Sequence, residues 1–104
     1  MLTFNEYQEF TATTAMDSIK DNTTYFALEL CDEAGEVAGK VKKLLRDGTF
    51  DGYETAKELG DCLYPIARLA DLLGYSLLEI AEMSKEKLTS RVERGVISGS
   101  GDNR

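Results

Sequence analysis

The sequence predicts an all-α protein, and three observations support this fold class. The chain of 104 residues contains only one proline, and most of its glycines lie at segment ends or near the C-terminus. Apolar side chains recur at intervals of three and four residues, the spacing of one face of an α-helix. No useful stretch shows the strict apolar–polar alternation typical of a β-strand. We expect about four helices in an antiparallel bundle that oligomerisation completes.

The first two helices are predicted at residues 5–19 and 25–46. Thr3 and Glu6 form a capping-box pattern. The residues that follow at roughly helical spacing are Phe4, Tyr7, Phe10, Thr14 and Ala15. After a polar turn, Thr23 or Thr24 can cap the second helix. The apolar stripe of this helix consists of Leu30, Ala34, Val37, Val41, Leu44 and Leu45.

Two further helices are predicted after Gly48, which stops the second helix. A capping-box pattern at Asp51 opens the third helix, which we expect to end near Gly74. The same pattern at Ser76 opens the fourth helix, over residues 77–94.

The chain is long enough for one domain with a modest core. We expect residues 1–95 to form a single all-α domain. Residues 96–104 are rich in glycine and serine, and this tail is predicted to be disordered or held by a partner.

The charge of the chain restricts its partners. It carries 19 acidic and 12 basic side chains, a formal net charge of -7. Non-specific nucleic-acid binding needs a basic surface, so this class of partner is disfavoured. An anionic small molecule stays possible if metal ions screen the acidic site. No apolar run approaches the roughly 20 residues that span a bilayer, and the N-terminus lacks a signal-like core. We therefore expect a cytoplasmic protein without a membrane partner.

The cysteine and histidine content restricts the chemistry. Cys31 and Cys62 are expected to be reduced, buried side chains, and they lack zinc-site spacing. The chain contains no histidine. This excludes histidine-activated nucleophiles and metal sites built on imidazole. Any metal must be held by oxygen atoms, which points to magnesium or manganese.

Two pairs of carboxylates stand out. Glu33 and Glu36 are three residues apart, as are Glu58 and Asp61. Residues at this spacing lie on one helix face, where like charges destabilise the helix unless something neutralises them. Both pairs have close apolar neighbours, and partly buried carboxylates are costly without partners. The pairs are either ordinary solvated positions or ligands of a divalent cation.

The expected hairpin would bring the two pairs together. The turn between the second and third helices is short, so these helices should pack antiparallel. The first pair lies about 17 Å before the turn and the second about 12 Å after it, at 1.5 Å per residue. At these comparable heights, facing pairs would form a four-carboxylate cage.

The sequence around these pairs resembles a known family. It reads Glu33-Ala-Gly-Glu36, then 21 residues, then Glu58-Leu-Gly-Asp61. The flanking stretches DEAGEVAGKVKKLLRD, KELGDCL, ARLADLLG and LLEIAEMSKEKLTSR and the closing RGVISGSGDNR strengthen the match. From about residue 25, the chain is similar to small, single-domain bacterial and phage members of the MazG-like all-α nucleoside triphosphate pyrophosphohydrolases.

The resemblance implies hydrolysis of a nucleoside triphosphate, expected to be a deoxynucleoside triphosphate, to the monophosphate and pyrophosphate. The implied ligands of Mg²⁺, with Mn²⁺ as a substitute, are Glu33, Glu36, Glu58 and Asp61. One carboxylate of this set would accept the proton of the attacking water. Asp32 or Glu29 could join the site or remain on a solvated flank.

The resemblance also implies that Lys87 and Arg91 contact the substrate phosphates; the alternative is a charged surface stripe. Two departures from the family pattern are present. Ser84 stands where relatives often carry asparagine, which leaves base and sugar recognition open. Pro65 lies one turn after Asp61 and cannot donate a hydrogen bond to the Asp61 carbonyl. A kink there could reshape the cage or free that carbonyl to bind metal or water, or the helix could tolerate the proline.

Two alternatives remain beside the leading hypothesis. One is an enzyme similar to phosphoribosyl-ATP pyrophosphohydrolase. The other is a non-catalytic helical module that assembles with itself or a partner. A homodimer or homotetramer is expected in each case, because the helices are apolar on more than one side and family members complete their pockets with a neighbouring subunit.

Overall fold

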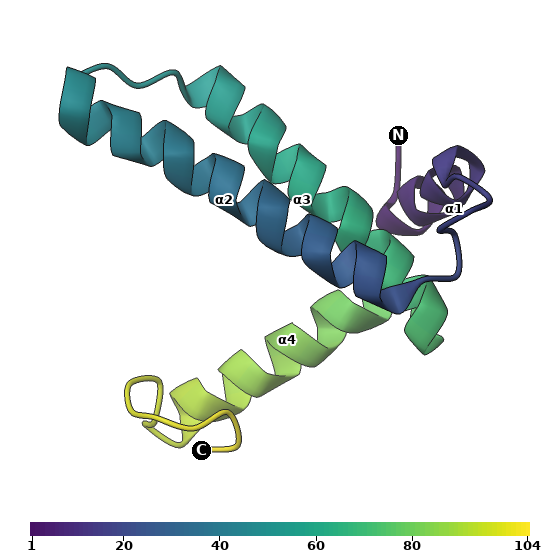
Figure 1. The fold of residues 1–104 in the computed structure, drawn as a ribbon. Coiled ribbons are helices and arrows are strands. Elements are labelled where there is room, and N and C mark those ends of the chain that lie inside the picture. The colour runs from purple at the N-terminus through teal and green to yellow at the C-terminus, as the bar shows by residue number, and fades with distance from the viewer.

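The computed structural model describes residues 1–104 and contains four helices and no strand. The helices are α1 (Phe4–Thr14), α2 (Thr23–Asp47), α3 (Gly52–Leu73) and α4 (Leu77–Glu93), as Figure 1 shows. The all-α prediction is therefore confirmed. None of these helices combines the length and the apolar character required to cross a membrane.

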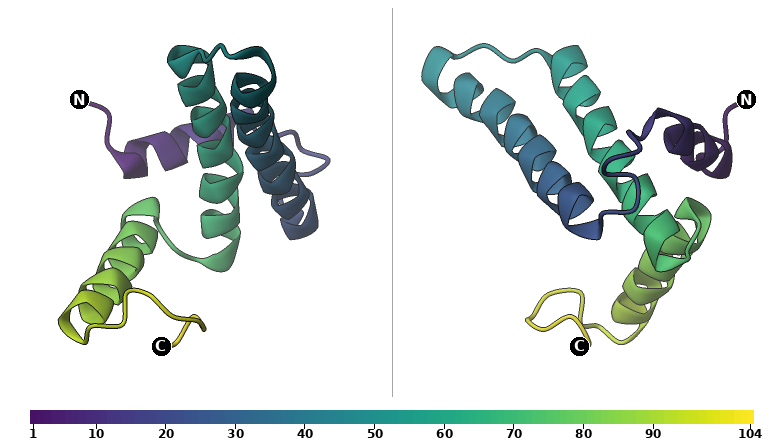
Figure 2. Two further views of the ribbon diagram at one scale, coloured as in Figure 1. Left: turned by 90° about the vertical axis from the view of Figure 1, so that its left-hand side faces the viewer. Right: turned by 45° about the vertical axis from the view of Figure 1, so that its right-hand side comes forward.

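Helices α2 and α3 form the framework of the molecule. They lie side by side and run in opposite directions, joined by residues 48–51 (Figures 1 and 2). Gly48 ends α2 with a φ of 72°, and its N–H donates to the Leu44 carbonyl at 2.8 Å. Asp51 then accepts from the Glu54 N–H at 3.1 Å and opens α3. This short connection determines which residues of the two helices face each other.

The N-terminal cap of α2 differs from the prediction. Asn22, and not Thr23 or Thr24, accepts a hydrogen bond from the Tyr25 N–H at 3.0 Å. Asparagine is a stronger N-terminal cap than threonine. Helix α2 consequently begins at Thr23.

Helix α1 is shorter than predicted. It ends at Thr14, with Ala15 in an extended conformation, so residues 15–19 are not helical. The hydroxyls of Thr11, Thr13 and Thr14 donate to backbone carbonyls three residues earlier. Such local hydrogen bonds compete with the helical pattern, and β-branched side chains lose rotamer freedom in a helix. The threonine-rich end therefore stops the helix early.

Buried polar side chains attach α1 to the molecule, together with Tyr7, which packs against the core cluster. Gln8 and Thr11 are buried, whereas Phe4 and Phe10 are more than half exposed. The Gln8 amide donates to the Asp71 carboxylate and the Tyr75 carbonyl at 2.7 and 2.9 Å. The aromatic spacing in the sequence therefore indicated only part of the buried face of α1, the part that Tyr7 occupies.

The same buried group also fixes the start of α4. The Leu77 N–H donates to the Gln8 side-chain oxygen at 2.8 Å. Arg68, itself buried, donates to the Thr11 hydroxyl at 3.0 Å and to the Gln8 carbonyl at 3.2 Å, and it pairs with Asp71. Buried polar groups are costly unless paired, and here each named group has a partner.

The apolar core of one chain is small. Only 10 of 104 residues are buried, and the central cluster consists of Ala67, Ala70 and Leu77. Helix α4 contacts α1 and α3 but projects away from α2 (Figure 2). Consistent with this open shape, the radius of gyration is 16.4 Å, whereas a compact chain of this length has about 13 Å. One chain alone is an open set of helices.

Pro65 does not interrupt α3. The helix is continuous from Gly52 to Leu73, with Pro65 fully buried inside it. Because proline has no N–H, it cannot donate to the Asp61 carbonyl. The packing around Pro65 accommodates this loss without ending the helix.

The tail is not disordered. Residues 95–104 turn back and lie against α4 of their own chain (Figure 1). The structure thus shows the tail folded onto its own chain, and a contact of the tail with a partner stays a prediction. Hydrogen bonds from Arg104 to tail carbonyls hold the loop together.

Candidate metal centre

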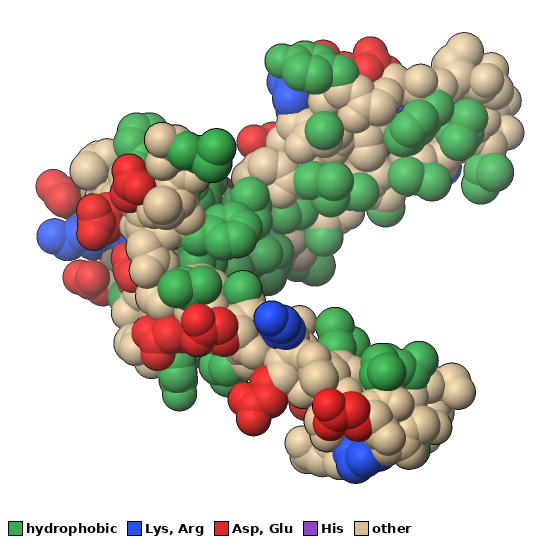
Figure 3. Space-filling model, turned by 180° about the vertical axis from the view of Figure 1, so that it is seen from behind, with side chains coloured by type: hydrophobic (Ala, Val, Ile, Leu, Met, Phe, Trp, Pro, Cys, Tyr) green, Lys and Arg blue, Asp and Glu red, His purple; other side chains and the backbone are tan.

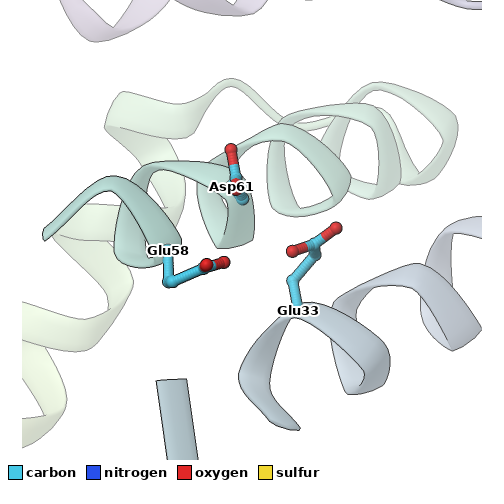
Figure 4. A group of neighbouring side chains, drawn as sticks. All are labelled: Glu33, Glu58 and Asp61. Atoms are coloured by element: carbon cyan, nitrogen blue, oxygen red, sulfur yellow. The ribbon is translucent and has the colours of Figure 1, made fainter. Parts of the chain in front are cut away.

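Three carboxylates converge between the helices of the hairpin. Glu33 extends from α2, and Glu58 and Asp61 extend from α3 (Figure 4). Each residue offers one carboxylate oxygen, and these oxygens all lie within 4.8 Å of one another. Glu33 and Glu58 are partly buried, and Asp61 is exposed. The group is thus open to solvent on one side.

The convergence follows from local helical geometry. Glu58 and Asp61 are separated by one helical turn, so they share a face of α3. The connection at residues 48–51 places that face opposite Glu33 on α2. The predicted match in height between the two acidic pairs is borne out for these three residues.

Glu36 lies outside the converging group. Its side chain is exposed on the next turn of α2, and its oxygens are not among those that meet. Of the four carboxylates in the predicted cage, three therefore converge in this structure. A role for Glu36 as a ligand stays a prediction.

The carboxylates are not neutralised by basic side chains. No lysine or arginine forms an ion pair with Glu33, Glu58 or Asp61. Burial raises the pKa of the Glu33 carboxyl, and the neighbouring negative charges raise this pKa further; they belong to Asp61, Asp32, Glu58 and Glu29. Uncompensated charges of one sign at this separation favour either protonation or a bound cation.

The donor set fits a hard divalent cation. Oxygen ligands on opposite sides of Mg²⁺ are about 4.2 Å apart. The three carboxylate oxygens lie within 4.8 Å of one another, so small side-chain rotations would bring them to the distances that such a cation requires. One turn before Glu33, the Oε2 atom of Glu29 is buried and has no hydrogen-bond partner. Burial and the charge of Asp32 raise the pKa of the Glu29 carboxyl. An unpaired, buried acceptor beside an acidic group is an arrangement that a cation or its water ligands would satisfy.

Tyr7 was not predicted to lie near the carboxylates, whereas Cys62 was expected to border them as the residue after Asp61. Burial raises the pKa of the Tyr7 hydroxyl, and so do the nearby charge of Asp61 and the hydroxyl of Tyr64, so α1 brings Tyr7 toward the site. The pKa of the Cys62 thiol is raised by burial and then by the surrounding carboxylates. The helical spacing in the sequence placed Tyr7 on the apolar face of α1, but it did not show that this face lies against α3 near Asp61.

The cysteines confirm part of the expectation. Both are free thiols. Cys31, however, is exposed and Cys62 is only partly buried, contrary to the prediction of buried side chains.

The predicted phosphate contacts lie apart from the carboxylates within one chain. Lys87 and Arg91 are on α4, which extends away from the hairpin (Figures 1 and 2). Both side chains pair with Asp102 of the tail. Ser84, on the same helix, borders an apolar groove of about 180 Å³ whose other lining residues are Phe4, Leu63, Ile66, Leu77, Ile80 and Ala81.

Comparison with known proteins gives two matches. The family model of the MazG nucleotide pyrophosphohydrolase domain matches residues 21–96. The chain is also similar to the Gene 37 protein of Mycobacterium phage L5, with 45% identity over 95 residues, covering 85% of this chain and 81% of that protein. No solved structure matches the chain. The span matched by the family model contains α2, α3, α4 and every predicted site residue.

Proposed function

The chain belongs to the MazG nucleotide pyrophosphohydrolase family, and from that premise we propose that it hydrolyses a nucleoside triphosphate to the monophosphate and pyrophosphate. Deoxynucleoside triphosphates are the expected substrate class, and Mg²⁺ is the expected cofactor. The observation that carries the proposal is the convergence of Glu33, Glu58 and Asp61. None of these three carboxylates pairs with a lysine or arginine side chain.

The proposed reaction joins a water oxygen to the α-phosphorus and breaks the bond between that phosphorus and the bridging oxygen of the β-phosphate. Pyrophosphate leaves, and the proton of the water passes to a carboxylate of the site. Glu33, Glu58 and Asp61 would hold the divalent cation, with Glu36 as a further ligand. When bound, such a cation neutralises phosphate charge and lowers the pKa of a water ligand.

Lys87 and Arg91 are proposed to bind the phosphate oxygens. Arginine and lysine side chains both donate charge-assisted hydrogen bonds to phosphate. Because α4 carries them away from the carboxylates of the same chain, we infer that a site containing both groups forms between copies in a homodimer or homotetramer.

The surface of one chain supports assembly. Figure 3 shows hydrophobic side chains gathered on the hairpin and in the hollow between the hairpin and α4. Large apolar residues of α2 are exposed, among them Leu28, Val41 and Leu45. Extensive exposed apolar surface of this kind is typical of an interaction site.

The decisive experiment is a panel of ribo- and deoxyribonucleoside triphosphates assayed for pyrophosphate release with Mg²⁺. We expect release from at least one nucleotide, and loss of activity by at least about 100-fold in Asp61→Asn and Glu36→Gln. Glu82→Gln, which removes an exposed carboxylate of α4, serves as the control and should retain activity. Release of orthophosphate, or equal activity in Asp61→Asn, would contradict the proposal.

A further inference from the structure

The tail forms a defined loop. Gly95, Gly99 and Gly101 have φ values of 70°, 132° and 90°, which L side chains rarely adopt. The Arg104 guanidinium donates to the carbonyls of Val96, Ile97 and Gly101 at 3.1, 2.8 and 2.8 Å, respectively. These contacts close the loop on itself.

The loop rests on α4 through polar contacts. Lys87 Nζ donates to the Asp102 carboxylate at 2.9 Å, and Arg91 Nη2 lies 3.6 Å from the same oxygen. Arg91 also donates to the Asp102 carbonyl, and Arg94 donates to the Arg104 carbonyl. The hydrogen bond and charge of Lys87 lower the pKa of the Asp102 carboxyl. The carboxylate is therefore ionised and serves as the counter-ion of both basic side chains.

No residue from 95 to 104 is buried, so little apolar contact holds the loop in place. The Asp102 side chain is 74% exposed and that of Lys87 46%, whereas the Arg91 side chain is only 10% exposed. Exposed ion pairs contribute little to stability. The exposed Lys87–Asp102 pair therefore does little to hold the loop, and the contacts that its release must break are the polar contacts of Arg91 and Arg94.

We propose that the tail is a displaceable latch, in which the Asp102 carboxylate occupies the place of a substrate phosphate on Lys87 and Arg91. Carboxylate and phosphate are both anions that only accept hydrogen bonds, so the same basic pair cannot serve both fully. A triphosphate or pyrophosphate group carries more charge and more acceptors than one carboxylate, so it displaces Asp102. The latch rests on the proposed assignment of Lys87 and Arg91 to phosphate.

Pyrophosphate binding tests the latch without hydrolysis. Calorimetric titration with inorganic pyrophosphate in EDTA compares the parent protein with Asp102→Asn, which keeps the side-chain shape and removes the charge. We expect Asp102→Asn to bind about two- to fivefold more tightly, the factor that corresponds to the loss of exposed ion pairs. The matched control Asp17→Asn removes an exposed aspartate that pairs with Lys20 and should leave the affinity unchanged.

A second variant alters the loop and keeps its charge. A Cβ at Gly99 would lie 3.2 Å from Arg104 Cδ, in a backbone conformation unfavourable to alanine. Gly99→Ala should therefore also bind pyrophosphate more tightly. In the parent protein, the NMR amide signals of Gly99 and Gly101 should shift as pyrophosphate saturates. Equal or weaker binding by Asp102→Asn, unchanged tail signals at saturation, or undiminished binding by Lys87→Met would each overturn the latch.

The outcome separates the latch from the enzymatic proposal. If nucleotides are hydrolysed with release of pyrophosphate but Asp102→Asn binds pyrophosphate with unchanged affinity, the enzymatic proposal holds and the latch proposal fails. If no nucleotide is hydrolysed but pyrophosphate displaces the tail, the latch proposal holds and the enzymatic proposal fails.

Discussion

At the scale of single residues, the main feature is negative charge that the chain does not neutralise. Glu33 faces Glu58 and Asp61, and no basic side chain pairs with any of them. Lys87 and Arg91, by contrast, are paired with Asp102. The repulsion within the acidic group is thus relieved by protonation or by a bound cation, and this gives the protein a measurable pH dependence.

The stability of the metal-free protein should fall as the pH rises from 4.5 toward neutrality. The folded-state pKa values of Glu33 and Glu29 are raised above 4.5, so the folded state binds their protons more tightly. Their contribution to stability is present below pH 4.5 and is lost as the pH rises through the raised pKa values. Thermal melting in EDTA across this range measures the effect. Mg²⁺ added at pH 7 should raise the melting temperature.

Matched variants identify the source of this dependence. Glu33→Gln should flatten the pH profile and abolish the Mg²⁺ effect, whereas Glu82→Gln should do neither. The pKa values of Asp47 and Asp102 are lowered from 3.8, so these two groups change the stability only at more acidic pH and do not affect the range above pH 4.5. A non-catalytic module would show no stabilisation by Mg²⁺ or Mn²⁺, so an unchanged melting temperature would favour that alternative.

The residue types of the site could be read from the sequence, but their final contacts could not. The absence of histidine and the two acidic pairs limited any metal site to oxygen ligands. Helical spacing alone does not show that Glu36 stays exposed while Glu33 turns inward. This depends on the packing of α3 against α2, which is a long-range contact.

At the scale of helices, capping and turn residues predicted the hairpin well. Asp51, Gly48 and Gly74 mark the ends of α2 and α3 as expected. The buried face of the first helix was predicted only in part, because polar side chains lie beside Tyr7 on that face. Gln8 and Thr11 are buried through hydrogen bonds with groups more than 55 residues away, which no local pattern indicates.

Loss of the Thr11 hydroxyl should destabilise the protein by about 1–3 kcal/mol. In Thr11→Val, the Arg68 Nε–H and the Gln8 carbonyl each lose a hydrogen bond in a buried environment. Urea denaturation followed by circular dichroism measures the change. The control is Thr13→Val, because Thr13 is exposed and its hydroxyl bonds only to the Phe10 carbonyl. Equal stability of the two variants would contradict the proposed importance of the buried contacts.

At the scale of the whole molecule, the open arrangement of helices predicts that subunits share a site. Glu58→Gln and Arg91→Ala should each be inactive or strongly impaired alone. If the carboxylates and the basic pair come from different subunits, a mixture reassembled at random as dimers should recover about a quarter of the parent activity. Mixing the two variants after mild denaturation and assaying pyrophosphate release tests this. No recovery, with oligomers confirmed by sedimentation, would place both groups in one subunit.

The sequence could predict four helices but not the angle between them. Apolar stripes show that a helix has a face to cover, and they do not identify the covering element. In this chain, much of the α2 stripe stays exposed, including Val41, Leu44 and Leu45. One chain alone therefore does not close a bundle, and the oligomerisation expected to complete it stays a prediction.

The Gln8 side chain links the end of α3 to the start of α4, and this affects how copies of the chain can assemble. This one group binds Asp71 and the Tyr75 carbonyl near the end of α3, and it accepts from Leu77 at the start of α4. It thereby helps to set the direction in which α4 leaves the hairpin. Gln8, however, precedes residues 21–96, the span that the family shares. Substitution of Gln8 should therefore change the direction of α4, and with it any assembly in which α4 takes part, while Glu33, Glu58 and Asp61 keep their places on the hairpin.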